Sequence, residues 1–331
     1  MIEIFHTKFL NNDDLNSVRE LYRELNYVSI YQDVDFVMLQ ENKNIFFLLK
    51  NNNKLLAYCI ISENHLSKFS FIKTAYLNYG IISKEIEFEE KLFDFIINYL
   101  KKEKYTELIL DFYLNKFTFR KYIKNIKPIT NLKRATILID LFENMDEIES
   151  NFSKDLKKNL KRAQNLNIEV REVQNDSEVE YLCVLQKKMS FKRNVFHYSD
   201  ELFKKILYNF FKSEKATIFG CYYDEILIGG IVVVYQGNRA EYFIGVTDPE
   251  FRKIPQSHMT NYIAIKDSKK RGFKYYDMGG IVLNSKESDQ IFHITNFKFN
   301  FSKNTSNYFP KSKIVYNHFL SILKTIYLRI A

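Results

Sequence analysis

The sequence predicts an α/β protein made of two similar domains, residues 1–150 and 151–331, each with a mixed central sheet. First, a pattern of hairpin, strand, helix and strand occurs twice along the 331 residues. Second, residues 1–150 carry 20 basic and 22 acidic side chains, whereas residues 151–331 carry 29 and 18. Third, eight of the nine glycines lie between Gly220 and Gly280. We therefore expect a basic second domain that faces an anionic partner.

The first half alternates between helical and strand patterns. Two apolar runs around an Asn-rich turn predict a hairpin, and apolar residues at helical spacing predict the helices. Helices are expected at 13–25 and 87–105, and strands at 45–61 (the hairpin), 74–82, 106–114 and 135–141.

The second half repeats this plan. The hairpin IFFLLKNNNKLLAYCII of the first half matches IFGCYYDEILIGGIVVV at residues 218–234, and each hairpin is followed by a strand, a helix and a strand. Helices are expected at 154–167, at 258–273 and as a pair ending at Lys212, and strands at 168–173, 217–247 and 274–281. The agreement in order and spacing indicates a duplicated domain.

Composition and motifs exclude several classes of protein. With 46% hydrophobic residues the chain can bury sizeable cores, so general disorder is excluded. The three cysteines lie far apart, with no C-x-x-C spacing that would indicate a zinc site or a disulfide framework. No run approaches about 18 apolar residues, and the start lacks a signal region. The sequence therefore predicts a cytoplasmic protein without a metal or a permanently bound cofactor, and it shows no nucleotidase, serine hydrolase, zinc protease or dinucleotide motif.

Three segments of the second half resemble the FemABX peptidyltransferases. Residues 153–170, SKDLKKNLKRAQNLNIEV, resemble the helix that opens that family's second domain. YDMGGI at Tyr276–Ile281 is similar to its Y-D/N-x-x-G-I strand end, and NFKFNF at Asn296–Phe301 is similar to its F-K pair. The resemblance implies two tandem GNAT-like domains, of the acyl-CoA N-acyltransferase type, with an acceptor-side first domain and a donor-side second domain.

The resemblance also implies the reaction. Members of the family move an aminoacyl group from aminoacyl-tRNA to an amine of a peptidoglycan precursor, while related GNAT-like proteins of polysaccharide pathways use acyl-CoA to acylate an amino sugar. Either donor is a substrate, and the acceptor would be a nucleotide- or lipid-linked glycan precursor. A non-catalytic pseudo-enzyme that binds RNA or an anionic membrane is a further alternative. The basic second half and the missing CoA loop favour the tRNA donor.

Two catalytic residues are implied by the resemblance. Lys298, in the F-K pair, matches the family position whose ammonium stabilises the oxyanion formed when an amine attacks an ester or thioester. Asp111, at the end of the strand ELILD, lies where the family has a carboxylate facing the acceptor amine. Phe112 replaces the family's proline after this aspartate, and a structural role at the strand end is the alternative.

Substrate-binding residues are expected in three places. The loop MSFKRNVFHYSDELF matches a family segment that binds the acceptor, and its basic side chains suit a diphosphate. Two neighbouring aromatics match residues that line the donor channel, although an alternating strand buries one of any such pair. Asp277 would orient a site lysine or end its strand. The residues are Ser190, Lys192, Arg193, Tyr198, Tyr242, Phe243 and Asp277.

A phosphate- or RNA-binding stripe is predicted on the helix at 154–167. Its five cations recur at the spacing of one helix face, with Leu156 and Leu160 turned away. Like charges on one face repel, and an anion such as a tRNA phosphate would relieve that repulsion. The alternative is a solvated lysine face. The stripe consists of Lys154, Lys157, Lys158, Lys161 and Arg162.

Two further features of the sequence concern the identity of the acyl donor and contact with a membrane. The segments before the two crossover helices, SKEIEFEE and DPEFRKIPQSH, lack the glycine loop that cradles the CoA pyrophosphate in ordinary GNAT domains. The tail at 311–331 predicts a basic amphipathic helix with Phe319 and Ile322 on one face and Ser321 and Lys324 on the other. We expect this helix to pack on its own domain, with peripheral contact at the inner face of the membrane as the alternative.

Overall fold

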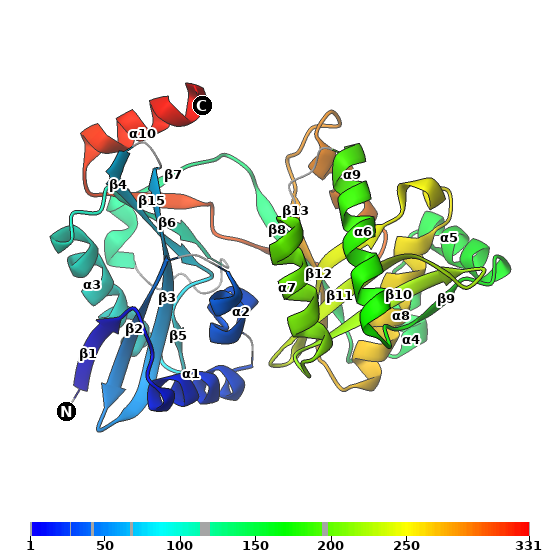
Figure 1. The fold of residues 1–331 in the computed structure, drawn as a ribbon, viewed down its shortest axis with the longest axis horizontal. Coiled ribbons are helices and arrows are strands. Elements are labelled where there is room, and N and C mark those ends of the chain that lie inside the picture. Colours follow the sequence, from blue (N-terminus) through cyan, green and yellow to red (C-terminus); the bar gives the residue numbers. More distant parts are fainter. Residues whose placement is uncertain are drawn as a thin grey trace. The chain divides into compact units, whose positions relative to one another are not determined.

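The computed structural model describes residues 2–26, 28–40, 43–66, 69–112, 120–193 and 198–330. The chain divides into two compact units (Figure 1). Unit 1 consists of Met1–Arg134 together with Asn307–Ala331, and unit 2 consists of Ala135–Ser306. Each unit contains a sheet with parallel and antiparallel neighbours and helices packed on it, so the expected α/β fold class with two mixed sheets is confirmed.

The sheet of unit 1 has the strand order β1-β2-β3-β4-β6-β15-β7, with β5 paired to β3. Only the β4–β6 pair is parallel among the register pairs of the described residues. The strands are β1 (Ile2–Thr7), β2 (Lys43–Asn51), β3 (Lys54–Leu66), β4 (Phe69–Asn78), β5 (Ile82–Ser83), β6 (Glu107–Asp111), β7 (Ile126–Pro128) and β15 (Ser312–Val315).

The hairpin of β2 and β3 forms where the Asn-rich turn predicts it. Asn52 and Asn53 adopt φ angles of 48° and 66°, the left-handed pair that matches the twist of a two-residue hairpin. Asn tolerates this conformation better than most residues, because its short polar side chain can hydrogen-bond locally. The register runs from Asn51↔Lys54 to Lys43↔Glu63, with one irregularity between Leu49 and Lys50.

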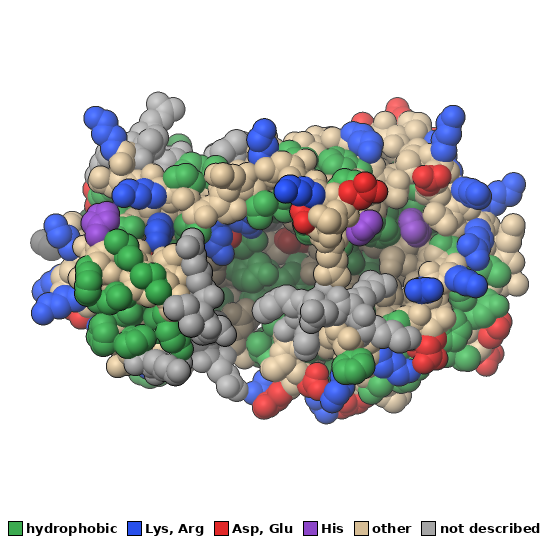
Figure 2. Space-filling view, turned by 90° about the horizontal axis from the view of Figure 1, so that it is seen from above, with side chains coloured by type: hydrophobic (Ala, Val, Ile, Leu, Met, Phe, Trp, Pro, Cys, Tyr) green, Lys and Arg blue, Asp and Glu red, His purple; other side chains and the backbone are tan. Residues whose placement is uncertain are grey.

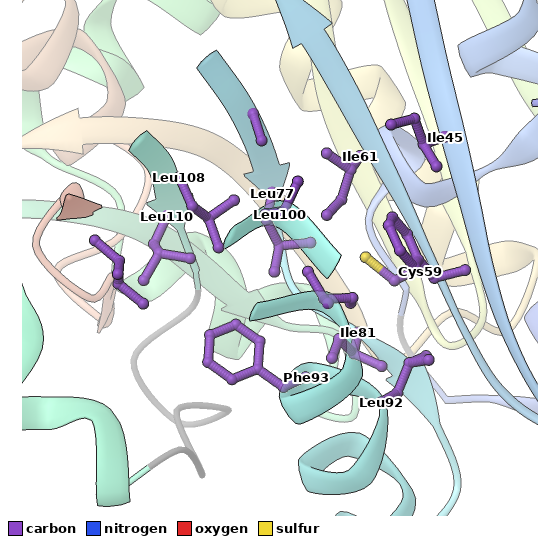
Figure 3. Close-up of a cluster of buried hydrophobic side chains, with 14 of the residues drawn as sticks. Ile45, Cys59, Ile61, Leu77, Ile81, Leu92, Phe93, Leu100, Leu108 and Leu110 are labelled. Atoms are coloured by element: carbon purple, nitrogen blue, oxygen red, sulfur yellow. The ribbon is translucent and has the colours of Figure 1, made fainter. Parts of the chain in front are cut away.

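Helices cover both faces of the unit 1 sheet (Figure 1). On one face, Leu92 and Phe93 of α3 pack on strand residues such as Leu77, and Figure 3 shows this cluster. On the other face, Val18 of α1 and Val34 of α2 contribute to a second cluster. The helical elements are α1 (Asn12–Glu24), η1 (Ile30–Gln32), α2 (Val34–Leu39), α3 (Ile86–Lys102), η3 (Arg120–Asn125) and α10 (His318–Ile330).

The sheet of unit 2 has the order β14-β8-β13-β12-β11-β10-β9. As in unit 1, an antiparallel meander leads through a crossover helix, here α8, to a parallel neighbour. The strands are β8 (Arg134–Asp140), β9 (Glu169–Glu172), β10 (Ala216–Tyr223), β11 (Ile226–Gln236), β12 (Arg239–Thr247), β13 (Tyr275–Val282) and β14 (Thr305–Asn307). The helical elements are α4 (Met145–Ser150), α5 (Lys154–Asn165), α6 (Asp176–Arg193), α7 (Asp200–Phe211), η4 (Pro249–Phe251), α8 (Gln256–Lys270) and α9 (Gln290–Phe299).

The two units differ from the predicted division at residue 150. The strand β8 and the helix α4 belong to unit 2, because Ile137 and Ile148 pack into its main core. The last 25 residues belong to unit 1, because β15 pairs with β6 and β7. Periodicity identifies such strands but not the sheet they join.

This division also changes the charge balance. Unit 1 carries 24 basic and 17 acidic side chains, and unit 2 carries 25 and 23. The strongly basic second half of the sequence is therefore not a strongly basic unit, since four of its cations and no acidic residue lie in the returning tail. An anion site on unit 2 has to rest on a local cluster of cations.

The C-terminal helix α10 packs on the protein as expected, but on unit 1, not on the predicted domain of residues 151–331, and through its polar face. Ser321 and Lys324 are buried, while Phe319 and Ile322 are 70% and 60% exposed. None of the described helices is long and apolar enough to cross a lipid bilayer.

Candidate active site

The candidate site of unit 2 begins where two neighbouring parallel strands part. The parallel register of β12 and β13 covers only Arg239–Glu241 and Tyr275–Asp277, although both strands continue beyond it. A bulge against β11 places Phe243 between the paired Tyr242 and Ile244. Bulges of this kind redirect a strand and the side chains after it. Beyond Glu241 on β12 and Asp277 on β13 the two strands therefore separate. We call the place where they separate the seam.

A glycine lets Lys298 reach this seam. Gly279 has φ +75°, and a Cβ atom on it would lie 3.1 Å from the carbonyl oxygen of Tyr242 and 3.3 Å from Lys298 Nζ. Lys298 extends from α9 and donates a hydrogen bond of 3.0 Å to the carbonyl oxygen of Gly280. Its Nζ lies 5.7 Å from the centre of the Tyr242 ring. The Gly279-Gly280 pair is thus more than a strand end, because it makes room for the lysine head group.

Lys298 is a buried cation. Lys298 is 7% exposed to solvent. Burial lowers its pKa to about 8, and the carboxylates of Asp277 and Glu241 oppose that change. At neutral pH the group is mainly protonated, but it is held in surroundings poor in water. An ammonium in such a place stabilises a developing negative charge more strongly than one in bulk water does.

Asp277 supports the seam from inside the protein. It is fully buried, and its carboxylate accepts hydrogen bonds from Arg239 Nη1 at 2.8 Å, from the Gly279 amide at 2.8 Å and from the Thr136 hydroxyl. These three donors come from β12, β13 and β8, so Asp277 ties three neighbouring strands together. With no exposed surface it offers nothing for a ligand to touch. The sequence-based expectation that Asp277 orients a site lysine fits this position better than direct substrate binding does.

Glu241 is a site residue that the sequence motifs did not predict. It follows Arg239 on the same face of β12 and accepts a hydrogen bond of 3.1 Å from Gln236 Nε2. Burial, and then the charge of Asp277, raise the pKa of Glu241. Its carboxyl and the Lys298 ammonium attract each other electrostatically. A glutamate between the apolar residues of AEYFIG was the available signal, because such a side chain is rarely placed in a buried strand without a partner.

Tyr242 and Phe243, the predicted donor-channel aromatics, lie at the seam but differ in their surroundings. Tyr242 lies beside Lys298, whereas Phe243 packs edge-on against Phe210 of α7 with ring centres 5.8 Å apart. Both are partly exposed. The structure therefore brings Tyr242, Asp277 and Lys298 together, and Tyr242 is the aromatic that shares the lysine's surroundings.

The predicted cationic stripe forms on α5. Lys154, Lys157, Lys158, Lys161 and Arg162 are all exposed, and Leu156 and Leu160 are buried on the opposite face. Within the described residues, none of these five cations forms a salt bridge. Ser153 caps the helix and donates a hydrogen bond of 2.8 Å to Asn300 Oδ1, at the end of α9.

An open hollow lies along this stripe. It has a volume of about 660 Å³, and Lys158, Lys161, Arg162 and Asn300 are among its lining residues. Asn300 is two residues beyond Lys298, so the stripe reaches the end of the helix that carries the lysine. The five cations remain a prediction as ligands, but their exposure leaves them available to an anion.

The predicted acceptor loop lies largely within a helix. Ser190 is on α6, is 4% exposed, and donates a hydrogen bond of 2.8 Å to the Gln186 carbonyl of the same helix. Lys192 and Arg193 end that helix, and their side chains, like residues 194–197, are outside the described part of the structure. Tyr198 is partly exposed and precedes α7. The helix continues here because no Gly or Pro interrupts residues 176–193.

Asp111 ends β6 in unit 1, as the sequence predicts, and is tied to a neighbour. Its Oδ1 accepts a hydrogen bond of 2.7 Å from Arg134 Nη1, and the Arg134 guanidinium lies 5.3 Å from the centre of the Tyr308 ring. Asp111 is 8% exposed. This pairing fits the structural alternative, and the predicted role toward the acceptor amine stays a prediction.

Neither a metal cluster nor a glycine loop appears at the described sites. Among the residues that the structure describes, no three His, Cys, Asp or Glu side chains form a group that could hold a metal ion. Before α8, residues 248–255 contain the short η4 helix, which Asp248 caps, and Pro255 precedes the first residue of α8. This segment lacks the glycines that let backbone amides surround a pyrophosphate.

Comparison with known proteins identifies the fold. Residues 150–288 match the family model described as an acetyltransferase (GNAT) domain. The structure of FemX superimposes with a TM-score of 0.78 at 12% identity, covering 96% of this chain and 99% of that one. The chain is a tandem GNAT-fold protein. The expected resemblance to the FemABX proteins is thereby confirmed at the level of the fold.

Other tandem GNAT structures are similar over nearly the whole chain. L-PGS from Bacillus licheniformis has a TM-score of 0.65 at 9% identity, with 95% of this chain and 96% of that chain covered. A tandem GNAT protein from the clavulanic acid biosynthesis pathway has a TM-score of 0.54 at 10% identity, with 96% and 99% covered. No curated protein sequence matches the chain. At these identities the comparisons establish the fold alone.

Proposed function

We propose that this tandem GNAT protein is an acyltransferase that moves an aminoacyl group from aminoacyl-tRNA to an amine of a cell-envelope glycan or peptidoglycan precursor. The observation that carries the proposal is the buried Lys298 at the seam between β12 and β13. Its position in a GNAT-like unit, together with the FemABX-like segments around it, supports a role in acyl transfer.

The proposed reaction needs little covalent chemistry from the protein. The acceptor nitrogen attacks the ester carbonyl carbon, a C–N bond forms, and the carbonyl oxygen becomes an oxyanion beside the Lys298 ammonium. Collapse of this intermediate breaks the C–O bond to the ribose, whose oxygen leaves with a proton. Positioning and oxyanion stabilisation would supply most of the rate. No covalent intermediate on the enzyme is required.

The proton lost by the attacking amine needs an acceptor. Glu241 suits this role, because burial and the charge of Asp277 raise its pKa to about 8, and a general base works best with a pKa near the operating pH. Asp111 is the other candidate, on the resemblance alone. Comparing the activities of Glu241→Gln and Asp111→Asn decides between them, since only loss of the working base should remove the acidic limb of the pH–rate profile.

The α5 stripe supports the choice of donor. Five exposed cations without carboxylate partners suit the phosphates of a tRNA acceptor arm, and the hollow beside them is also lined by Asn300, two residues after Lys298 in the chain. A Lys158→Glu/Lys161→Glu variant should weaken tRNA binding at least tenfold. The matched control, Lys266→Glu/Lys270→Glu on α8 of the same unit, changes the charge equally and should leave binding nearly unchanged.

A second candidate is an acyl-CoA-dependent N-acyltransferase acting on an amino sugar of surface polysaccharide synthesis. The observation that favours it is the match of residues 150–288 to an acetyltransferase domain model. The absent glycine loop before α8 weighs against it.

The deciding experiment offers both donors in parallel. Total tRNA charged with labelled amino acids and labelled acetyl-CoA are each incubated with nucleotide-linked peptidoglycan precursors and amino sugars. We expect label transfer from tRNA, and a loss of at least a hundredfold in turnover for Lys298→Met but not for the exposed control Lys303→Met. Transfer from acetyl-CoA alone would replace the tRNA proposal with the second candidate. Binding of tRNA without any transfer would indicate a non-catalytic RNA-binding protein.

A further inference from the structure

The C-terminal helix α10 is docked with its polar face inward. Lys324 is 8% exposed and donates hydrogen bonds to Glu107 on β6 and, at 2.8 Å, to Thr74 on β4. Ser321 donates to the same Glu107 carboxylate at 2.9 Å. Lys313 of β15 also contacts this carboxylate, at 3.0 Å. Several hydrogen bonds to one buried carboxylate thus fix the rotation of the helix about its axis.

This rotation leaves the apolar face of α10 in solvent. The side chains at the spacing of one helix face, and two phenylalanines of β4, are 39–70% exposed. Phe69 of β4 packs edge-on against Tyr327 of α10, with ring centres 5.6 Å apart, so helix and strand form one continuous surface. Figure 2 shows apolar side chains gathered where unit 1 carries α10. We call this surface the α10 patch; it consists of Phe69, Phe71, Phe319, Ile322, Leu323 and Ile326.

The charged residues of the segments that build the α10 patch indicate what kind of surface binds to it. The two stretches of unit 1 that build it, residues 64–84 and 307–331, contain no aspartate or glutamate. They contain seven lysine and arginine residues, of which Lys313 and Lys324 are paired with Glu107 and Lys84 with Glu24. Two copies of such a surface would bring like charges together, whereas an anionic surface would be attracted. An exposed helix face of Phe, Ile and Leu, in a segment that has cations and no acidic residue, has the composition of helices that lie in the membrane interface.

We propose that the α10 patch is a peripheral docking surface for an anionic lipid bilayer. The helix lies flat on the bilayer, with its apolar face among the acyl chains and with the Glu107 cluster holding it to unit 1 from behind. The proposal is independent of the acyl donor and of the catalytic role of Lys298. It would bring a lipid-linked acceptor close to the protein if the proposed function holds.

Vesicle co-sedimentation of the full chain tests the proposal. The probes are vesicles of equal parts phosphatidylglycerol and phosphatidylcholine, and vesicles of phosphatidylcholine alone. We expect the chain to bind the anionic vesicles more tightly, and Phe319→Ser/Ile322→Ser/Ile326→Ser to lower the partition coefficient at least tenfold. The control Phe9→Ser/Met38→Ser/Phe142→Ser removes three equally exposed apolar side chains elsewhere and should bind like the unchanged protein. Thermal melting of each variant checks the fold, and the replaced side chains are exposed in every case.

The absence of tryptophan gives a second readout. Ile322→Trp introduces a single tryptophan into a chain that has none, and the tryptophan emission should shift to shorter wavelength with anionic vesicles. Phe142→Trp should show no shift. No vesicle binding by the unchanged chain, or equal binding by the α10 triple variant, would overturn the proposal. So would loss of binding only in the Lys158→Glu/Lys161→Glu variant, or a dimer that the α10 triple variant dissociates in the absence of lipid.

Discussion

Both units contain a parallel strand pair at the same place in the fold, but the two pairs end differently. In unit 1, β4 and β6 stay paired over five residues, up to Asn78↔Asp111. In unit 2, β12 and β13 pair over three residues, up to Glu241↔Asp277, and then part. In both units the last pair contains an aspartate that is bound by an arginine, Asp111 by Arg134 and Asp277 by Arg239.

The two units differ in the backbone beyond the last pair. In unit 1 the chain turns at Tyr79 and Gly80, and the Tyr79 ring stacks on Tyr31 with centres 5.0 Å apart. In unit 2 the bulge at Phe243 and the left-handed Gly279 open a seam that Lys298 enters. One fold thus yields a closed strand end in one unit and a seam holding a buried cation in the other. The site therefore depends on a short backbone irregularity next to a scaffold present in both units.

The largest expected difference concerns the two arginine–carboxylate pairs. Arg239→Met should lower the free energy of unfolding by about 3–5 kcal/mol, because it leaves the fully buried Asp277 charge without its cation. Arg134→Met should cost only about 1–2 kcal/mol, because both side chains of that pair reach solvent. Urea unfolding of the two variants measures both values. Equal losses would show that the two strand ends are energetically alike.

The second prediction concerns the left-handed glycine that follows the parallel strand pair in each unit, Gly80 and Gly279. Gly279→Ala should lower turnover ten- to a hundredfold, because the new Cβ would crowd Tyr242 and Lys298 Nζ. Gly80→Ala has a similar steric conflict, with Phe112 Cδ1 at 3.1 Å, and should reduce stability without a specific loss of turnover per folded molecule. Steady-state kinetics corrected for the folded fraction separate the two effects. A comparable loss of turnover in both variants would contradict the assignment of the seam as the site.

The pH dependence of activity tests the seam directly. The rate should fall as the pH rises through about 8, because Lys298 then loses the positive charge that stabilises the oxyanion. Lys298→Arg should retain part of the activity and lose this alkaline limb, since arginine stays protonated. A pH–rate profile from 5.5 to 10 measures both. A limb that persists unchanged in Lys298→Arg would assign it to another group.

The smallest expected effect concerns a histidine of unit 2. Burial lowers the pKa of His258 to about 4, and its ring packs against Phe297 with centres 5.0 Å apart. Because the folded pKa lies below the unfolded value of 6.5, the folded state binds fewer protons, and stability falls as the pH drops from 6.5 toward 4. His258→Phe should remove roughly 2 kcal/mol of this loss. The control His6→Phe, at an exposed position on β1, should leave the acid unfolding curve where it is.

Much of this fold and part of the site can be predicted from the sequence. The hairpin at Asn52–Asn53, the helix after Ser153 and the repeated strand–helix–strand order are local signals, and the structure has all of them. Lys298, Tyr242 and the glycine pair, which the sequence singles out separately, lie together in the structure, and their roles stay predictions.

The remaining features depend on contacts between distant segments. Glu241 becomes a site residue only because β13 brings Asp277 beside it, and no local pattern reports that pairing. The tail shows the same limit, because its amphipathic pattern predicts one buried face but not that the polar face is the buried one. The polar face is buried because Lys324 hydrogen-bonds to Glu107, which lies more than 200 positions earlier in the chain.

The place of β15 in the sheet has a consequence for biosynthesis. This strand lies between β6 and β7 and carries residues 312–315, so it leaves the ribosome after the whole of unit 2. Unit 2, residues 135–306, is contiguous and can fold while synthesis continues. Unit 1 must wait with an unpaired β6 edge until its last strand emerges. The N-terminal unit is therefore the last to be completed, and ribosome stalling near residue 306 would leave it as the aggregation-prone part of the chain.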